Sequence, residues 1–168
     1  MSTIAIIGYR GSGKTTISEW IANYLDMSCI DTDDKVLEHL GMSSVQSAWD
    51  EEGEARWREV EAKIIPSLLQ ENAVVSLGGG APMSESVKDA LGKVPMVINC
   101  IADEETTLAR IAKGQDRPML YGDDLQVRRD RLATYESLAT HELNSNGDFE
   151  SVIPRIQTLL MDLDSNEP

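Results

Sequence analysis

A glycine-rich run near the start of the chain carries the residues with the clearest chemistry. Residues 8–15 read GYRGSGKT and fit the pattern G-x-x-x-x-G-K-[ST], in which backbone N–H groups surround phosphate oxygens just ahead of a helix. Glycines are required there because a Cβ would obstruct the inward-turned backbone. Lys14 is expected to reach the β- and γ-phosphates, and Thr15 a Mg²⁺ ion. The run predicts nucleoside triphosphate binding; the alternative is a glycine-rich turn between a strand and a helix.

Two carboxylates, Asp31 and Asp33, stand at i and i+2 where a short apolar segment, residues 28–31, ends. At the end of a strand, one carboxylate can face Mg²⁺ while the other faces an acceptor hydroxyl. The same stretch also suits the start of a helix, with Asp33 or Asp34 as the N-cap. The residues alone leave both interpretations open.

Two further segments could select a substrate. Arg58 and Glu61 stand three apart on a long charged helix predicted over residues 52–70, so they share a face; the alternative is a solvated ion pair. Residues 78–80 are consecutive glycines that end a buried strand, which lowers stability unless something must approach the backbone closely. A ligand lying on bare backbone is the predicted cause.

A polar segment over residues 113–124 is bracketed by glycines and lies between two helical patterns. It predicts a mobile lid that carries Arg117. Phosphoryl transfer is catalysed mostly by positioning and by neutralisation of charge. A lid that brings an arginine onto the transferring group and excludes water has a clear purpose in that chemistry.

The elements that must position these residues alternate along the chain. Near-continuous apolar runs predict buried strands at residues 4–7, 73–76 and 94–101, and residues 28–31 are a shorter candidate strand. Helical patterns fill the gaps, and one with apolar positions between residues 152 and 163 follows near the C-terminus. This alternation predicts an α/β fold with a parallel sheet covered on both faces. The phosphate-binding run, Asp31 and residues 78–80 each follow a strand, so they should meet at one edge of the sheet.

The composition excludes several classes of partner. The chain has 168 residues, of which 41% are hydrophobic, and this predicts one domain with a real core. A formal net charge of −14 argues against nucleic acid or an anionic membrane, because both reward clustered Lys and Arg. A site for an anionic substrate must concentrate positive charge locally in such an acidic chain. Arg58, Arg117 and Arg131 are therefore candidate residues for such a site.

The cysteines and the lack of a targeting pattern point to a compartment. Neither a secretory signal nor an apolar run of about 20 residues is found, so the chain is expected to be a cytoplasmic protein. Cys29 and Cys100 are interpreted as buried free thiols, which suits a reducing compartment. His39 and His141 are isolated, and no ligand or catalytic role is expected for either.

Taken in order, the motifs resemble the shikimate kinase family. The chain carries G-x-x-G-x-G-K-T, D-T-D, an aromatic residue followed by R-x-x-E, G-G-G, R-P-x-L and a late R-x-x-x-Y, spread from residue 4 to about residue 160. The resemblance implies transfer of the γ-phosphoryl group of ATP to the 3-hydroxyl of shikimate, with Mg²⁺ bridging the phosphates. Its implied fold is a single three-layer α/β domain of the P-loop kinase type, with a parallel sheet of about five strands, helices on both faces and a mobile lid.

The implied domain covers residues 1–163, with an acceptor-binding helical region at about 33–62, a lid at about 113–124 and a frayed acidic tail at 164–168. Lys14, Asp33 and Arg117 would be catalytic, with Asp33 as the candidate general base that holds the acceptor hydroxyls. Thr15 and Asp31 would serve the metal, Asp31 through water. The residues expected to contact the nucleotide are Gly11, Ser12, Gly13, Lys14, Thr15, Thr16, Arg110 and Arg117.

On the acceptor side, the resemblance implies that Arg58 and Arg131 bind the substrate carboxylate, since guanidinium groups match it with paired hydrogen bonds. The backbone of Gly79 and Gly80 would line the pocket, and Glu61 would hold Arg58. Arg110 would lie near the adenine.

The chain also departs from the family pattern. Trp49 and Trp57 stand where Phe is usual, the residue before Tyr135 is Thr rather than the frequent Pro, and the expected last strand at 141–146 is polar. Two other functions stay open: a kinase for another small hydroxy acid such as gluconate, and a non-catalytic ATP-binding module. The expected partners are ATP and shikimate, and the expected state is a monomer.

Overall fold

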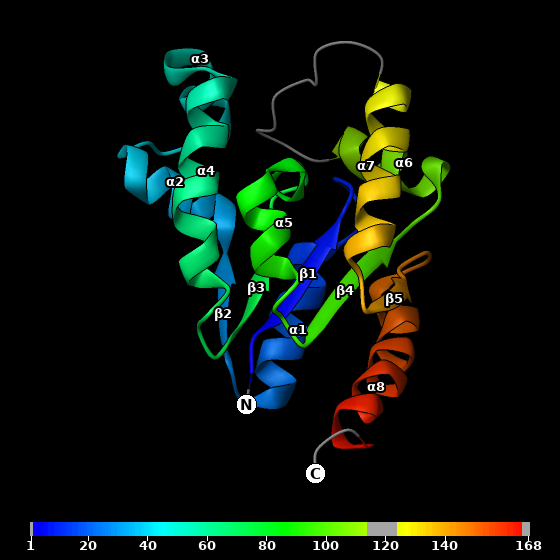
Figure 1. Cartoon of the computed structure of the whole chain (residues 1–168). Helices are drawn as coiled ribbons and strands as arrows, with labels where there is room; N and C mark the ends of the chain where they lie inside the picture. Colours follow the sequence, from blue (N-terminus) through cyan, green and yellow to red (C-terminus); the bar gives the residue numbers. More distant parts are fainter. Residues whose placement is uncertain (1, 114–123, 166–168) are drawn as a thin grey trace.

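Five parallel strands form the sheet at the centre of the computed structural model, which describes residues 2–113 and 124–165 (Figure 1). The elements in chain order are β1 (Ile4–Gly8), α1 (Lys14–Leu25), β2 (Ser28–Asp31), α2 (Thr32–Leu40), α3 (Val45–Glu52), α4 (Glu54–Leu68), β3 (Ala73–Ser76), the short 3₁₀ turn η1 (Ala81–Met83), α5 (Glu85–Leu91), β4 (Met96–Ile101), α6 (Glu104–Lys113), α7 (Asp124–Leu138), β5 (His141–Asn144) and α8 (Phe149–Ser165).

The strands lie in the order β2-β3-β1-β4-β5, so β1 is central. Ile4 of β1 pairs with Val74 of β3 on one side and with Met96 of β4 on the other. Because all neighbours are parallel, the carboxyl ends of the strands share one edge. The predicted α/β class and the shared edge are confirmed.

Alternation along the strands divides the core into two layers. Ile4 and Ile6 pack on one face of the sheet against apolar side chains of α1 and α8. Ala5 and Ile7 pack on the other face, against side chains of α4, α5 and α7. A central strand of this sheet is apolar on both faces. This is why the apolar runs in the sequence are continuous and do not alternate with polar residues.

A third and smaller cluster lies outside the two main layers. Val36 of α2, Ala48 of α3, and Trp57 and Val60 of α4 are buried together. These helices stand beside the β2 edge of the sheet and form the helical region predicted at about 33–62 (Figure 1). The predicted helix at 52–70 begins later, at Glu54, because Gly53 has a φ of +84° and separates α3 from α4.

The two edge strands of the sheet, β2 and β5, are less buried than the central strands. Cys29 is exposed, so the interpretation of both cysteines as buried thiols was wrong for this one; Cys100 is buried. Cys29 lies on β2, which is an edge strand and is half uncovered. The polar segment at 141–146 does form a strand, β5, although only Leu143 of its four residues is buried. An edge strand needs only one anchoring side chain, since its remaining residues can face water.

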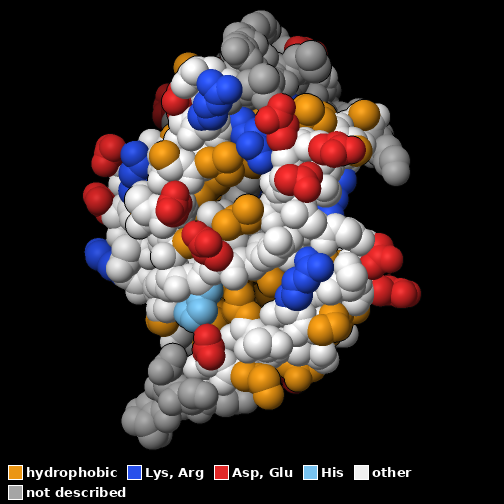
Figure 2. All heavy atoms as spheres, turned by 90° about the vertical axis from the view of Figure 1, so that its right-hand side faces the viewer, with side chains coloured by type: hydrophobic (Ala, Val, Ile, Leu, Met, Phe, Trp, Pro, Cys, Tyr) orange, Lys and Arg blue, Asp and Glu red, His pale blue; other side chains and the backbone are white. Residues whose placement is uncertain are grey.

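The side of the molecule that includes β5 and α8 shows both charged and hydrophobic side chains (Figure 2). Acidic side chains are spread over it, beside a smaller number of Lys and Arg side chains, as the net charge of −14 leads one to expect. Within residues 2–113 and 124–165, every helix is too short or too polar to cross a bilayer. Helix α8 runs to Ser165, two residues into the predicted tail, and most of the predicted lid lies outside the described residues.

The layered core makes a prediction about stability. Leu91 at the end of α5 is 1% exposed, whereas Leu108 on α6 is 48% exposed. Leu91→Ala should lower the free energy of unfolding by about 2–5 kcal/mol, because it removes buried methyl groups and leaves a cavity. Leu108→Ala should cost less than about 1 kcal/mol. Urea unfolding of both variants tests this, and equal losses would contradict the assigned layer between α5 and the sheet.

Candidate active site

The phosphate-binding loop joins β1 to α1 and uses its glycines as predicted. Gly11 and Gly13 have φ values of +81° and +89°, which side chains rarely adopt. A Cβ on Gly11 would also lie 2.8 Å from the backbone oxygen of Thr107, because α6 packs directly behind the loop. Lys14 starts α1, is only 8% exposed, and donates a hydrogen bond from Nζ to the backbone oxygen of Tyr9 at 3.2 Å. The loop therefore folds back around its own lysine.

Arg110 fixes this loop from behind. Its guanidinium donates to the backbone oxygens of Gly11 at 3.1 Å, Ser145 at 2.6 Å and Gly147 at 3.1 Å. The Ser145 hydroxyl donates to the backbone oxygen of Ser12 at 2.6 Å. The segment after β5 is thus tied to the phosphate-binding loop. The expected adenine contact of Arg110 stays a prediction, and its structural role is to hold these carbonyls together.

Thr15 and Thr16 follow Lys14 in the first turn of α1, and both are exposed at the end of the helix that faces the loop. Backbone N–H groups in this turn have no partner within the helix, and the helix dipole favours negative charge there. This placement suits the predicted contacts with phosphates and with a phosphate-bound cation.

Asp31 and Asp33 take different positions at the end of β2. Asp31 is the N-cap of α2, and its Oδ1 accepts a hydrogen bond from the backbone N–H of Asp33 at 2.8 Å. The alternative that placed the N-cap at Asp33 or Asp34 was wrong, because the helix starts at Thr32. Asp33 is 8% exposed and lines a pocket beside the loop. Burial, and then the charges of Asp33 and Asp34, raise the pKa of Asp31.

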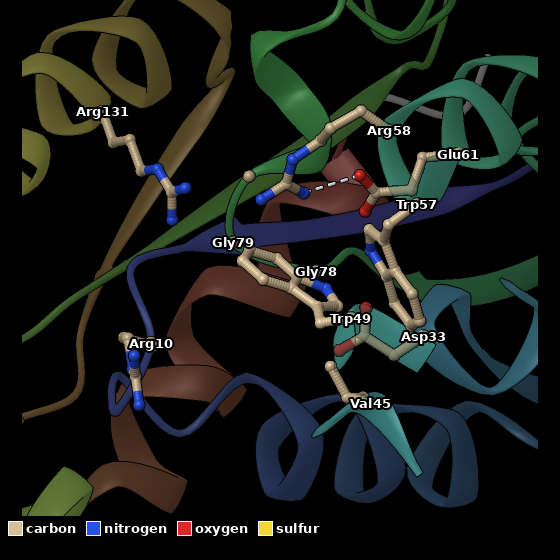
Figure 3. A pocket seen from close by; sticks show the side chains of 11 residues that line it. Arg10, Asp33, Val45, Trp49, Trp57, Arg58, Glu61, Gly78, Gly79 and Arg131 are labelled. Atoms are coloured by element: carbon tan, nitrogen blue, oxygen red, sulfur yellow. Dashed lines mark hydrogen bonds and ion pairs between the residues drawn. The ribbon is translucent and has the colours of Figure 1, made fainter. Parts of the chain in front are cut away.

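That pocket gathers most of the residues predicted for the acceptor side (Figure 3). Its lining residues come from the phosphate-binding loop, from α2, α3, α4 and α7, and from the loop after β3. They are Arg10, Asp33, Val45, Trp49, Trp57, Arg58, Glu61, Gly78, Gly79, Gly80 and Arg131. Arg58 and Arg131 reach the pocket from different elements and stand on opposite sides of Gly79 in this view.

The glycine run lines this pocket, and the structure explains two of its three glycines. A Cβ on Gly78 would collide with the carboxylate of Asp33, and a Cβ on Gly80 would collide with the guanidinium of Arg58. At Gly79 a Cβ would lie 3.5 Å from Nη1 of Arg131, which is an ordinary van der Waals distance. Side chains of the site therefore approach the backbone closely at Gly78 and Gly80, and the ligand expected on this backbone stays a prediction.

Arg58 is held by several groups at once. Its Nη1 donates to Oε1 of Glu61 at 2.6 Å, and its Nη2 lies 3.5 Å from Oε1 of Glu54. The guanidinium also lies 5.5 Å from the centre of the Trp49 ring, within reach of a cation–π interaction. Glu61 is 1% exposed, so the alternative of a solvated ion pair was wrong. Burial raises the pKa of Glu61 to about 7, although Arg58 acts to lower that pKa.

Arg131 and Tyr135, the two residues of the late R-x-x-x-Y motif, lie close together in the structure. Both lie on α7, four residues apart, and both reach Gly79. The Tyr135 hydroxyl donates to the backbone oxygen of Gly79, and burial raises the pKa of this side chain well above its ordinary value. Arg117 lies outside the described residues. Arg10 was not predicted as a site residue; its position inside the phosphate-binding run was the available signal.

A metal site built from protein side chains alone is not found in the part of the chain that the structure describes, where no three His, Cys, Asp or Glu residues converge. A phosphate-bound Mg²⁺ needs fewer protein ligands, since it keeps several waters. Thr15 at the start of α1 and Asp31 at the end of β2 carry oxygen ligands of the kind that such an ion takes, and their role as metal residues stays a prediction. Burial first, and then the charges of Asp33 and Asp34, raise the pKa of Asp31, and a cation would favour its ionised form.

A parallel sheet with a glycine-rich phosphate-binding loop after its central strand, and an arginine-lined pocket beside that loop, is the architecture of a small-molecule kinase of the P-loop class. A family model for shikimate kinase matches residues 10–160. A shikimate kinase from Caldicellulosiruptor bescii is 36% identical over 74% of this chain and 72% of its own length; one from Francisella philomiragia is 32% identical over 95% and 94%. The chain belongs to the shikimate kinase family.

Solved structures agree on the fold. A shikimate kinase from Acinetobacter baumannii in complex with shikimate superposes with a TM-score of 0.85, at 22% identity, over 100% of this chain and 96% of that one. At this level of identity the likeness shows the fold alone. The arrangement of strands and helices in Figure 1 is therefore that of a known P-loop kinase architecture.

The buried carboxyl of Glu61 predicts how stability depends on pH. Its pKa is about 7 in the folded chain and near 4.5 when unfolded, so between these values the folded state keeps a proton that the unfolded state releases. Stability contributed by this group is therefore lost as pH rises from about 5 to 7. Glu61→Gln removes the titration, and its stability relative to wild type should rise between pH 5 and pH 8 by on the order of 3 kcal/mol.

Urea unfolding at the two pH values measures this difference. Glu59→Gln is the matched control, because Glu59 pairs with Arg56 in the same i, i+3 spacing but its side chain is 70% exposed. It should show almost no pH-dependent difference from wild type. A relative stability of Glu61→Gln that stays flat or falls with pH would mean that Arg58 keeps Glu61 ionised throughout.

Proposed function

We propose that this protein transfers the γ-phosphoryl group of ATP to the 3-hydroxyl of shikimate, and so produces shikimate 3-phosphate and ADP. The observation that carries the proposal is one pocket in which Arg58 and Arg131 face a common space with Asp33, directly beside the phosphate-binding loop. Two guanidinium groups can hold a carboxylate while Asp33 holds a hydroxyl at the other end of a small ring. Membership of the family supports the same assignment.

The chemistry follows from the positions of Asp33 and Lys14. The acceptor hydroxyl oxygen attacks the γ-phosphorus, its proton passes to the carboxylate of Asp33, and the bond from phosphorus to the β,γ-bridging oxygen breaks so that ADP leaves. Lys14 and the N–H groups of residues 11–16 would hold the phosphates. Arg117 is proposed to contact the phosphates from the segment 113–124 and to exclude water.

Thr15 and Asp31 would hold Mg²⁺, Thr15 directly and Asp31 through water. When bound, the ion neutralises charge on the phosphates. ATP and shikimate are the proposed partners. We also propose that the enzyme works as a monomer in the cytoplasm; the two free thiols, Cys29 and Cys100, suit a reducing compartment.

The charge of the pocket favours an acidic acceptor over a neutral one. A neutral sugar would offer no anionic group to Arg131, and none to Arg58 beyond its pairs with Glu61 and Glu54. Such a ligand would lose the charge-assisted hydrogen bonds that a carboxylate makes to guanidinium groups. The carboxylate of a small hydroxy acid avoids that loss.

ADP release from ATP and Mg²⁺ tests the proposal directly. Shikimate should stimulate ADP release strongly, whereas quinate, gluconate and nucleoside monophosphates should not. Stimulation by gluconate alone would keep the kinase activity and reject shikimate as acceptor. ATP binding without stimulation by any member of the panel would instead support the ATP-binding module.

Substitution of Arg58 should separate acceptor binding from nucleotide binding. Arg58→Ala should raise KM for shikimate by about tenfold or more, because a charge-assisted contact to the carboxylate is lost, and should leave KM for ATP within about twofold. Arg56→Ala is the matched control, since Arg56 makes the same i, i+3 pair on the exposed face of α4. An unchanged KM for shikimate in Arg58→Ala would remove Arg58 from the acceptor pocket.

A further inference from the structure

Arg58 and Arg131 are held in different ways, although both line the acceptor pocket. Arg58 is paired with carboxyl groups, through Nη1 to Glu61 at 2.6 Å and through Nη2 to Glu54 at 3.5 Å. Arg131 extends from α7 toward the glycine run (Figure 3). Among residues 2–113 and 124–165, no carboxylate is paired with it. Arg131 is therefore oriented by something other than an ion pair.

The hydroxyl of Tyr135 is the neutral group beside Arg131. Tyr135 follows Arg131 by one turn on α7, so both side chains lie on the same face of the helix, and Tyr135 is 0% exposed. Its hydroxyl donates a hydrogen bond to the backbone oxygen of Gly79. Burial raises the pKa of Tyr135, and the guanidinium of Arg131 acts in the opposite direction, through its charge and a hydrogen bond. One hydroxyl thus contacts both the arginine and the glycine run.

A phenolic hydroxyl can serve both contacts at once, because it has one proton to donate and lone pairs that accept. Since the proton goes to the oxygen of Gly79, a lone pair is left for an N–H group of Arg131. Tyr135 stays neutral in this arrangement, so it directs the guanidinium without offsetting its charge. Glu54 and Glu61 are carboxyl groups and can offset the charge of Arg58. Arg131 therefore keeps a full positive charge for an anionic ligand in the pocket.

We propose that Tyr135 is a positioning residue for acceptor binding, whose hydroxyl holds the guanidinium of Arg131 beside the glycine run in the direction that the acceptor carboxylate requires. The inference rests on the proposed function, because it takes that carboxylate as the ligand of Arg131. Tyr135 is not among the residues that line the pocket, so it acts through Arg131 and not by contact with the acceptor. Loss of its hydroxyl should weaken acceptor binding and leave nucleotide binding unchanged.

A second buried hydroxyl contacts the same glycine run and supplies a comparison. Oγ1 of Thr32 accepts a hydrogen bond from the backbone N–H of Gly78 at 2.9 Å, and Thr32 is also 0% exposed. Thr32 begins α2, and this hydrogen bond does not involve Arg131. Removal of either hydroxyl takes a hydrogen bond from the run, but only the hydroxyl of Tyr135 also contacts Arg131. The two variants therefore separate loosening of the run from misorientation of the arginine.

A double-mutant cycle on the KM for shikimate tests the assignment. Tyr135→Phe keeps the buried ring and removes only the hydroxyl, so the variant should stay folded, which its circular dichroism spectrum checks. It should raise KM for shikimate about fivefold or more, with KM for ATP within about twofold and kcat within about threefold of wild type. In an Arg131→Ala background, Tyr135→Phe should raise KM for shikimate less than about twofold further, because the group that it orients is gone. Tyr24→Phe is the matched control, since Tyr24 is 55% exposed, and it should equal wild type.

Thr32→Val completes the cycle. It should change KM for shikimate by the same factor in the wild-type and Arg131→Ala backgrounds, because its hydroxyl does not act through Arg131. An unchanged KM for shikimate in Tyr135→Phe would overturn the proposal, and so would an equal factor for Tyr135→Phe in both backgrounds. Loss of additivity for Thr32→Val as large as that for Tyr135→Phe would also overturn it, because any loosening of the run would then have the same effect. Absence of ADP release stimulated by shikimate in the wild-type protein would instead reject the proposed function itself.

Discussion

The close fit of side chains against the bare backbone of residues 78–80 is the constraint on which the acceptor pocket depends. Asp33 and Arg58 occupy the space that a Cβ on Gly78 or Gly80 would need. Tyr135 adds a hydrogen bond to the backbone oxygen of Gly79. Elements from three regions of the chain are thereby brought to one short segment at the end of β3. Glycine at these positions lowers the stability of the strand end, but it permits these close contacts between side chains and backbone.

A second constraint is electrostatic, because the site concentrates positive charge in an acidic protein. Arg58 is oriented by Glu61, whose side chain is 1% exposed, and by the ring of Trp49. Burying a carboxylate is unfavourable, which raises the pKa of Glu61 to about 7. The pair therefore costs stability at neutral pH while it fixes the direction of the guanidinium. Such a cost is reasonable where orientation of an anionic substrate matters more than stability.

Sequence reasoning succeeded where one residue type satisfies one local requirement. The turn at the glycine-rich run, the buried strands and the shared edge of the sheet follow from glycine conformation, apolar runs and strand order, whereas the place of Arg58 beside Asp33 was implied by the resemblance to the family. It failed where tertiary context decides. Cys29 stands in an apolar stretch of the sequence, but it lies on an edge strand and is exposed. The N-cap of α2 is Asp31, not Asp33 or Asp34. Arg10 was missed because the motif leaves that position open to any residue. The structure shows its position, because Arg10 is among the residues that line the pocket.

Strand order explains why transfer must take place at the end of β1. The segments after β2 and β3 supply Asp33 and the glycine run, so the proposed function places the acceptor on that side of the sheet. The segments after β4 and β5 supply Arg110 and Ser145, which support the phosphate-binding loop from the other side. Since β1 lies between the two pairs, its loop is the place where both halves of the site are in reach. Arg10 belongs to that loop and is among the residues that line the pocket, so this one segment borders both halves of the site.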